Sequence, residues 1–267
     1  MKNEMNALIN AECPWRDTLY WYDTVDSTNT LAKKLAAEGA PHGTVVLASR
    51  QTAGRGRLGR SFHSPAGMGI YLSLLLRPLC HPEELMHLTC AAGVAACNAV
   101  ENATGFRPGI KWVNDLIARG KKLGGILTEL SVDSKTGLVD CAIIGIGLNC
   151  HHEAEDFPEE LRSIAISLKS ATGTAPSTLL LAARLIESLY EMDRQLLSDP
   201  HSIMSQYRLD CVTLGRPVTV IREDRERRGY AAGLDDRGGL IVDYPDGSRE
   251  TVNSGEVSVR GIYGYTP

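Results

Sequence analysis

Apolar residues repeat along the chain with the three-to-four-residue spacing of helices in three segments. The first follows the polar run DSTN at residues 26–29, which offers N-caps, and Gly39 offers a stop signal. The second covers residues 83–104 and the third covers residues 177–197, each with apolar side chains along one face. The pattern therefore predicts three helices.

Continuous apolar runs predict buried strands at residues 44–51, 69–78 and 138–150. Residues 109–131 predict two further strands, joined by a turn at residues 119–121. Strands and helices mixed in this way indicate an α+β domain.

The texture changes after about Leu214, where short alternating segments read PVTVI, YAAGL, GLIVDY, RETV and EVSVR. Turn signals at residues 235–239 and 245–247 separate them. Short strands of this kind predict a small β-barrel. We therefore expect a larger domain at residues 1–212 and a β-rich domain at residues 213–267.

Composition narrows the class of protein. The 267 residues are 43% hydrophobic and 22% charged, which is ordinary for a soluble globular chain. The net charge of −4 disfavours a generally basic nucleic-acid surface. The seven cysteines form no C-x-x-C pair, which favours a reducing compartment, and we expect a cytoplasmic protein. Neither a signal peptide nor a membrane span is expected.

Residues 54–60, GRGRLGR, match the weak pattern G-x-G-x-x-G. A dinucleotide-binding fingerprint needs a helix directly afterwards, whereas residues 61–65 lead into a predicted strand. A kinase loop is disfavoured because the chain has no H-R-D or D-F-G element. The arginines suit phosphate or carboxylate, and the glycines allow close approach of the backbone. The alternative is a solvated basic turn, which three arginines between two buried strands make less favourable.

A second candidate cluster begins at Lys111. On an extended segment, alternation would place Lys111, Val113 and Asp115 on one face, where a lysine and a carboxylate suit phosphate and a divalent cation. Lys122 follows eleven residues later, whereas Lys121 suits a solvated turn. The sequence around both lysines lacks the P-loop pattern.

Residues 145–149, GIGLN, end a predicted buried strand. Ligands often bind beyond strand ends, and Asn149 could contact an adenine edge. An ordinary turn is equally compatible, because asparagine and glycine are common in turns.

In combination, these segments resemble the biotin protein ligase family, the biotin–[acetyl-CoA-carboxylase] ligases. The resemblance is carried, in the family's order, by DSTN (26–29), RQTAGRGRLGR (50–60), SPAGMGIYLSLLL (64–76), KWVNDL (111–116), KKLGGILTEL (121–130) and IIGIGLN (143–149). It covers nearly the whole chain from Asp26 onward. The glycine–arginine heptad with K-W-x-N-D downstream is its most specific part.

The resemblance implies a mixed β-sheet flanked by helices, related to class II aminoacyl-tRNA synthetase cores, with a C-terminal SH3-like β-barrel. It also implies a two-step reaction. Biotin and ATP, with Mg²⁺, give biotinyl-5′-AMP and pyrophosphate, and the biotinyl group passes to a lysine of a biotin carboxyl carrier protein. We expect the barrel to support ATP or carrier binding.

Site residues are carried over position by position. The residues expected at biotin are Ser27, Thr28, Asn29, Gln51, Gly54, Arg55, Gly56, Arg57 and Lys122. Those expected at ATP are Arg57, Arg60, Lys111, Asn114 and Asn149. The expected catalytic residues are Arg57, Lys111, Asp115 and Lys122, and Asp115 is the expected metal ligand.

The chain departs from the family pattern at two places, with Val113 where proline is common and Phe62 where tryptophan is common. Some members carry an N-terminal DNA-binding domain. Only 25 residues precede Asp26, so we expect no DNA binding. A homodimer through an edge strand is conceivable. The alternatives in function are a lipoate or octanoate ligase and a non-catalytic nucleotide-binding module on the same fold.

Overall fold

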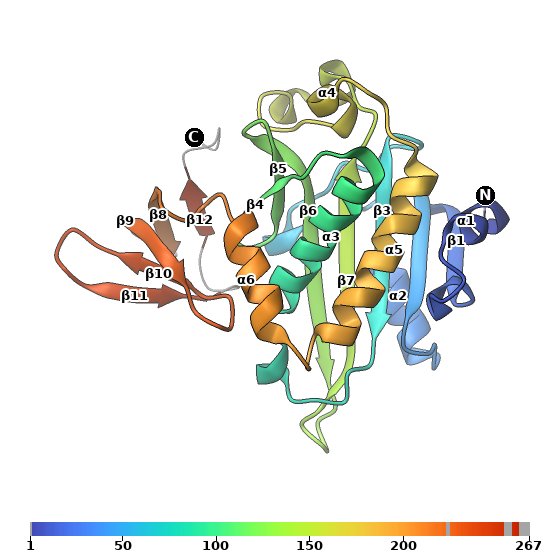
Figure 1. Ribbon diagram of the computed structural model, residues 1–267, viewed down its shortest axis with the longest axis horizontal. Coiled ribbons are helices and arrows are strands. Elements are labelled where there is room, and N and C mark those ends of the chain that lie inside the picture. Colours follow the sequence, from blue (N-terminus) through green and yellow to red (C-terminus); the bar gives the residue numbers. More distant parts are fainter. Residues whose placement is uncertain (1, 223–224, 254–257, 262–267) are drawn as a thin grey trace.

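The protein consists of a large mixed sheet with helices on both faces and a smaller sheet formed by the C-terminal residues (Figure 1). The structure is a computed structural model that describes residues 2–222, 225–253 and 258–261. Within these residues, no helix combines the length and the apolar character that a membrane crossing requires.

The large sheet has the strand order β1-β2-β3-β7-β6-β5-β4. Its β1 and β2 run parallel, and every other neighbouring pair is antiparallel. The strands are β1 (Leu19–Val25), β2 (Thr44–Gln51), β3 (Gly69–Leu76), β4 (Gly109–Lys111), β5 (Asp115–Ala118), β6 (Lys121–Val132) and β7 (Val139–Asn149).

Helices cover the two faces of this sheet unequally. In Figure 1, α3, α5 and α6 lie in front of the sheet and α2 lies behind it. The helices are α1 (Lys2–Leu8), α2 (Thr28–Ala37), α3 (Leu88–Thr104), α4 (Leu168–Thr172), α5 (Thr178–Gln195) and α6 (Pro200–Asp210).

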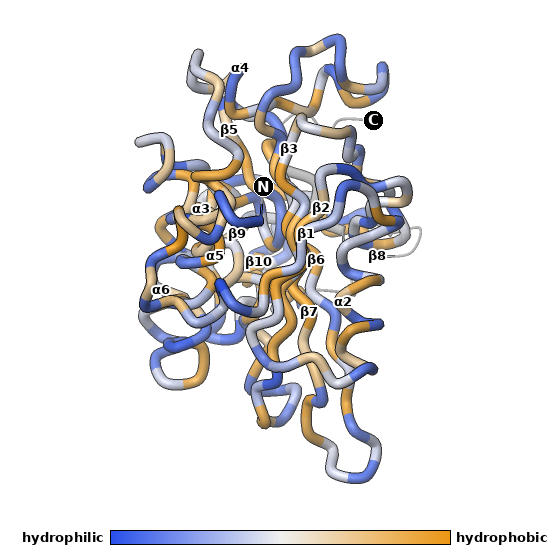
Figure 2. The backbone as a smooth tube through the Cα atoms, turned by 90° about the vertical axis from the view of Figure 1, so that its right-hand side faces the viewer, coloured by the Kyte–Doolittle hydropathy of each residue, from blue (hydrophilic) through white to orange (hydrophobic). Residues whose placement is uncertain are grey.

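Alternation along the strands sends side chains into two separate cores. On β7, Ile144, Ile146 and Leu148 pack in the main core, whereas Cys141 and Ile143 pack under α2. Because both faces are covered over much of the sheet, its strands read as continuous apolar runs, and they form the most apolar part of the tube in Figure 2. Further along the α2 face, β7 continues with Gly145 and Gly147, whose lack of side chains lets Asn29 and Phe62 pack against the strand.

The predicted α+β architecture is confirmed, and the three predicted helices correspond to α2, α3 and α5. The helix expected from residue 83 begins only at Leu88, after a short 3-10 turn at Pro82–Leu85. The prediction also omitted α1, β1, α4 and α6. For α6 a signal was present, since Pro200 occupies the first turn and the Asp199 side chain accepts a hydrogen bond from the Ser202 N–H.

The prediction of one extended segment across residues 111–115 is wrong. A tight turn at residues 112–114 separates β4 from β5, and the peptide bond between Trp112 and Val113 is cis. Lys111 and Asp115 pair directly across this hairpin, so cross-strand pairing places them together. The predicted turn at residues 119–121 is present, with Arg119 and Gly120 at positive φ.

The predicted C-terminal β-domain is confirmed as a five-stranded antiparallel sheet with the order β11-β10-β9-β8-β12. The two predicted turns join β9 to β10 and β10 to β11. Its strands are β8 (Pro217–Arg222), β9 (Arg225–Leu234), β10 (Leu240–Asp243), β11 (Arg249–Val252) and β12 (Ser258–Gly261).

Candidate active site

A cavity of about 450 Å³ opens on the α2 face of the large sheet, beyond the N-terminus of α2. Thirteen of the fourteen predicted site residues line it. They are Ser27, Thr28, Asn29, Gln51, Arg55, Gly56, Arg57, Arg60, Lys111, Asn114, Asp115, Lys122 and Asn149. Side chains that are far apart in the sequence therefore meet around one space.

Gly54 is the exception and lies outside the lining. A Cβ atom there would come within 2.6 Å of the Phe62 carbonyl and the Ser64 hydroxyl. Gly54 therefore lets the start of the glycine–arginine loop pack closely against residues 62–64, which follow the loop.

The start of α2 forms one end of the cavity. Ser27 occupies the N-cap position, yet its side chain makes no capping hydrogen bond. Gln51 takes that part, because its Oε1 accepts from the Thr28 backbone N–H at 2.8 Å. The Gln51 amide nitrogen in turn donates to the Ser64 hydroxyl. The helix end is thus fixed by a side chain from β2, while Ser27 and Thr28 border the cavity.

Asn29 is buried beside them in a fully bonded position. Its Oδ1 accepts from the Ser73 hydroxyl at 2.6 Å, and its amide nitrogen donates to Glu129 Oε2 at 2.9 Å. Burial raises the pKa of the Glu129 carboxyl, but hydrogen bonds from Lys33 and Asn29 outweigh it and lower the pKa below its ordinary value. Glu129 therefore stays ionised, and Asn29 is held in one orientation.

The floor of the cavity requires two glycines of β7. A Cβ on Gly145 would lie 2.1 Å from Asn29 Oδ1, and one on Gly147 would lie 2.5 Å from the Phe62 ring. Asn29 and Phe62 approach the sheet this closely only because these positions lack side chains. This explains the GIGLN segment, which the sequence alone left ambiguous.

The glycine–arginine loop, residues 54–60, reaches across the cavity and is attached to the sheet by two arginines. Arg55 Nη2 donates to Glu129 Oε1 at 3.1 Å, and Arg57 Nη1 donates to Asn114 Oδ1 at 2.9 Å. Burial lowers the pKa of Arg57 from its ordinary value. At the loop's tip, Leu58 has a φ of 56° and a side chain that is 67% exposed.

The two lysines predicted for the site both line the cavity. Lys122 Nζ forms an ion pair with Asp115 Oδ1 at 2.6 Å, and Lys111 is 6% exposed and pairs with Asp115 in the hairpin. A register shift between Leu116 and Ile117 makes Lys122 the partner of Ile117, which brings it to the face of Asp115.

Charge in the cavity is strongly unbalanced. Among the lining side chains that the structure describes, five are basic (Arg55, Arg57, Arg60, Lys111 and Lys122) and only Asp115 is acidic. The whole chain carries a net charge of −4. The cavity is therefore locally positive although the chain as a whole is acidic, and a local positive charge favours anion binding.

Part of the cavity wall is apolar and comes from residues 157–165, which the sequence analysis did not identify. Phe157, Leu161 and Ile164 line the cavity there, and the backbone N–H of Lys122 donates to the Ile164 carbonyl. Asn149 lies beside this wall and donates to the Ile166 carbonyl at 3.2 Å. Ile164 lies beside Lys122 in the folded structure but 42 residues away in the sequence, so no local sequence pattern indicated this contact.

A buried histidine supports this wall from behind. His152 is 0% exposed, stacks on the Phe157 ring at 4.5 Å, and has no hydrogen-bond partner for either ring nitrogen. Burial lowers its pKa to about 4, so the imidazole is neutral near pH 7.

No group of three or more His, Cys, Asp or Glu side chains gathers as a metal site in residues 2–222, 225–253 and 258–261. Mg²⁺ is commonly held by one or two carboxylates together with substrate phosphates. Asp115 is the one carboxylate among the described lining residues, so the side chains present could supply a single protein ligand to such an ion.

Comparison with known proteins agrees with this geometry. The Biotin/lipoate A/B protein ligase family model matches residues 21–149, and the Biotin protein ligase C terminal domain model matches residues 213–260. The bifunctional ligase/repressor BirA of Bacillus spizizenii is 36% identical, over 87% of this chain and 71% of that protein.

Two further relatives match over a larger share of their own length. The biotin–[acetyl-CoA-carboxylase] ligase of Mycobacterium tuberculosis is 34% identical, over 94% of this chain and 92% of that protein. The biotin protein ligase from Aquifex aeolicus, solved in complex with biotin and ATP, superposes with a TM-score of 0.77 at 30% identity and covers 91% of this chain and 98% of its own.

The fold and the cavity thus define an enzyme of the biotin and lipoate ligase class. Within that class, the chain belongs to the biotin protein ligase family.

Proposed function

We propose that this protein joins biotin to ATP and transfers the biotinyl group to a lysine of a biotin carboxyl carrier protein. The single observation that carries the proposal is the cavity in which five basic side chains and the polar end of α2 face one space. One end suits the head of biotin and the other suits phosphates.

At the biotin end, Ser27, Thr28 and Gln51 offer polar groups that suit the ureido ring. Gln51 is held by Thr28 and by Ser64, so its amide has one orientation. The adjacent Asn29 is fixed from both sides. Groups fixed in this way bind a small polar ring with little ordering cost.

In the first step, a carboxylate oxygen of biotin attacks the α-phosphorus of ATP, and the bond to pyrophosphate breaks. Both reactants are anions, so the step requires compensating positive charge. We assign this to Lys122 and Arg57 near the carboxylate and to Lys111 and Arg60 near the phosphates. Asp115 orients Lys122 through their 2.6 Å contact.

Mg²⁺ bound by ATP would be held by Asp115 on the protein side, and it would neutralise phosphate charge there. The neighbouring Asn114 is held in place by two hydrogen bonds. Its side-chain nitrogen donates to the Ile126 carbonyl, and its side-chain oxygen accepts from Arg57. Asn149 and the apolar wall at Phe157 suit the adenine ring.

In the second step, the amine of the carrier lysine attacks the biotinyl carbonyl carbon. A C–N bond forms, the C–O bond to AMP breaks, and the amine loses a proton. Before this step the mixed anhydride needs shielding from water, which the glycine–arginine loop would provide.

We assign the ligase chemistry to residues 1–212, because the described residues that line the cavity all lie between 27 and 165. Residues 213–267 form the second domain in this assignment. The separate family-model matches at residues 21–149 and 213–260 support the division.

ATP–pyrophosphate exchange measured with biotin, lipoate and octanoate tests the proposal. We expect exchange with biotin alone. Exchange with lipoate or octanoate in place of biotin would make the protein a ligase for that acid. Exchange with none of them would favour the non-catalytic module.

A further inference from the structure

The hairpin that carries Lys111, Asn114 and Asp115 into the cavity is held from its outer side. We call residues 109–118 the Lys111 hairpin. Trp112 lies in the turn of this hairpin. It donates its backbone N–H to Thr213 Oγ1 at 2.9 Å and its indole Nε1–H to the Gly238 carbonyl at 2.8 Å. Both acceptors lie in residues 213–267, and neither belongs to the described residues that line the cavity.

Two more hydrogen bonds join the same hairpin to the segment leading into the second domain. The Tyr207 hydroxyl donates to the Val113 carbonyl at 3.0 Å, and the Val212 N–H donates to the Ile110 carbonyl at 2.9 Å. Tyr207 is fully buried, and burial raises the pKa of its phenol well above the ordinary value, so it remains a donor. Three residues of the hairpin, 110, 112 and 113, are thus bonded to residues 207, 212, 213 and 238.

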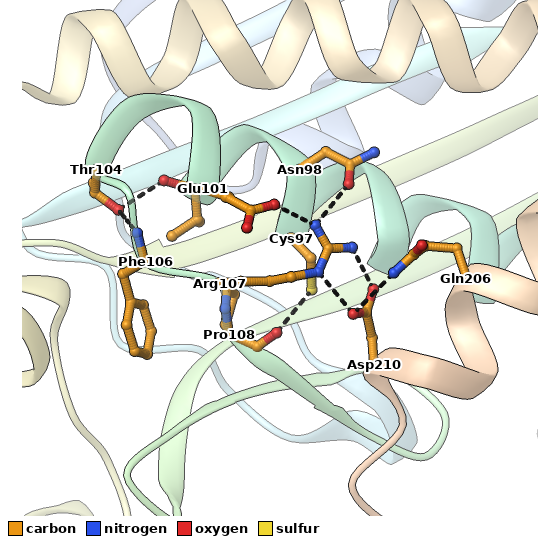
Figure 3. A network of polar contacts seen from close by, with 10 residues as sticks. Cys97, Asn98, Glu101, Thr104, Phe106, Arg107, Pro108, Gln206 and Asp210 are labelled. Carbon is orange, nitrogen blue, oxygen red and sulfur yellow. Dashed lines mark hydrogen bonds and ion pairs between the residues drawn. The ribbon is translucent and has the colours of Figure 1, made fainter.

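These anchoring groups are themselves rigidly placed. The Arg107 guanidinium, just before β4, binds both carboxylate oxygens of Asp210 at 2.8 and 2.6 Å, and it also contacts Asn98 and Glu101 on α3 (Figure 3). This bidentate contact fixes the end of α6 against α3, a few residues before Thr213.

The turn that supplies the Gly238 carbonyl is confined as well. Gly238 has a φ of +86° and packs on α3 so closely that a Cβ atom would lie 2.7 Å from Cys90 Sγ. From α6, Arg208 Nη2 reaches the carbonyls of Leu234 and Asp235 and the carboxylate of Asp236. The turn at residues 235–239 is therefore packed between α6 and α3.

We propose that Thr213 and the Gly238 carbonyl are positioning groups for ATP: they hold Trp112 and so set where Lys111 and Asn114 point. Thr213 is 3% exposed and does not line the cavity, so it acts through Trp112 rather than by touching a ligand. This inference rests on the proposed function, and it names the route by which the second domain contributes to the nucleotide end of the site.

Thr213→Val and Thr213→Ser form a matched pair for the test. Valine keeps the shape and removes the acceptor, which leaves the Trp112 N–H buried without a partner, whereas serine keeps the hydroxyl. We expect Thr213→Val to raise the KM for ATP about tenfold, the order that a lost buried hydrogen bond implies. The KM for biotin should change less than about twofold for either variant, because the α2 end lies elsewhere. Thr213→Ser should restore the KM for ATP.

The control is Thr44→Val at the start of β2. It removes another buried threonine hydroxyl, which donates to the Pro41 carbonyl at 2.8 Å. It should lower thermal stability without changing the KM for ATP. If Thr213→Val does not fold, Thr213→Ala removes the same acceptor with a smaller side chain and carries the same expectation.

ATP binding is also measured by equilibrium titration, so that a failure of the proposed ligase function can be distinguished from a failure of the positioning role. A wild-type protein that binds ATP but shows no exchange with biotin overturns the proposed function, and the ATP affinities of the variants then decide the positioning role. Equal ATP affinity and KM in wild type and Thr213→Val overturn the positioning role. So does a parallel rise in both KM values, no rescue by serine, or a wild type that does not bind ATP.

Discussion

Replacing Lys122 by methionine tests the proposed activation step at a single atom. Methionine keeps the apolar stem and removes the positive charge that lies 2.6 Å from Asp115 Oδ1. The Lys122 side chain is 28% exposed and that of Asp115 is 18% exposed, so the pair is neither in bulk water nor fully buried.

The position of Lys122 predicts a large effect on the reaction rate and a small effect on folding stability. Removing one group aimed at charge in the transition state costs about 2.7–4 kcal/mol, a factor of about 10²–10³ in rate. The effect on folding should be smaller, because partly exposed ion pairs are screened and contribute at most about 1 kcal/mol. We therefore expect Lys122→Met to lose almost all activity while remaining folded.

The assay is biotin-dependent ATP–pyrophosphate exchange at saturating substrates, with urea unfolding measured on the same samples. Lys121→Met is the matched control. Its Nζ is directed to the Arg162 carbonyl at 3.5 Å and does not line the cavity, so its exchange rate should remain near the wild-type value. An exchange rate for Lys122→Met above about one third of wild type would refute the reasoning, since it would correspond to less than about 1 kcal/mol.

Three further outcomes are expected. Gly145→Ala should raise the KM for biotin about tenfold, because the added Cβ would lie 2.1 Å from Asn29 Oδ1 and displace that hydrogen-bonded side chain. The control Gly233→Ala should leave this KM unchanged, because its Cβ would meet only Ile241, at 3.9 Å. Amide exchange at residues 55–60 should slow when biotin and ATP are added, and equal rates would contradict a closing loop. Because burial lowers the pKa of His152 to about 4, the unfolded chain binds a proton between pH 6.5 and 4 that the native state does not. Stability present above pH 6.5 should therefore fall over this window by up to about 3 kcal/mol. Urea unfolding of wild type and His152→Phe checks this, and the same pH dependence in both would contradict it.

The charged residues of the cavity were predictable in two steps: the glycine–arginine loop and the segment around Lys111 stand out in the sequence, and the resemblance to the biotin protein ligase family assigns them to one site. The helices α2, α3 and α5 were equally predictable, since apolar spacing of three to four residues has few other causes.

What the sequence could not predict depends on pairing between distant segments. The alternation rule assumed one extended strand through residues 111–115, and only the register between β4 and β5 shows that Lys111 faces Asp115. The position of Lys122 depends on a one-residue register shift that neither strand signals by itself. The wall at residues 157–165 and the contact from Thr213 to Trp112 are likewise defined only by the folded chain.

A crystal structure with biotin and ATP bound together tests the central claim most directly. We predict the ureido ring against Ser27, Thr28 and Gln51, with the α-phosphate within hydrogen-bonding distance of Lys122 or Arg57. Phosphates bound outside this cavity, or biotin bound with its ring at the Lys111 hairpin, would contradict the account.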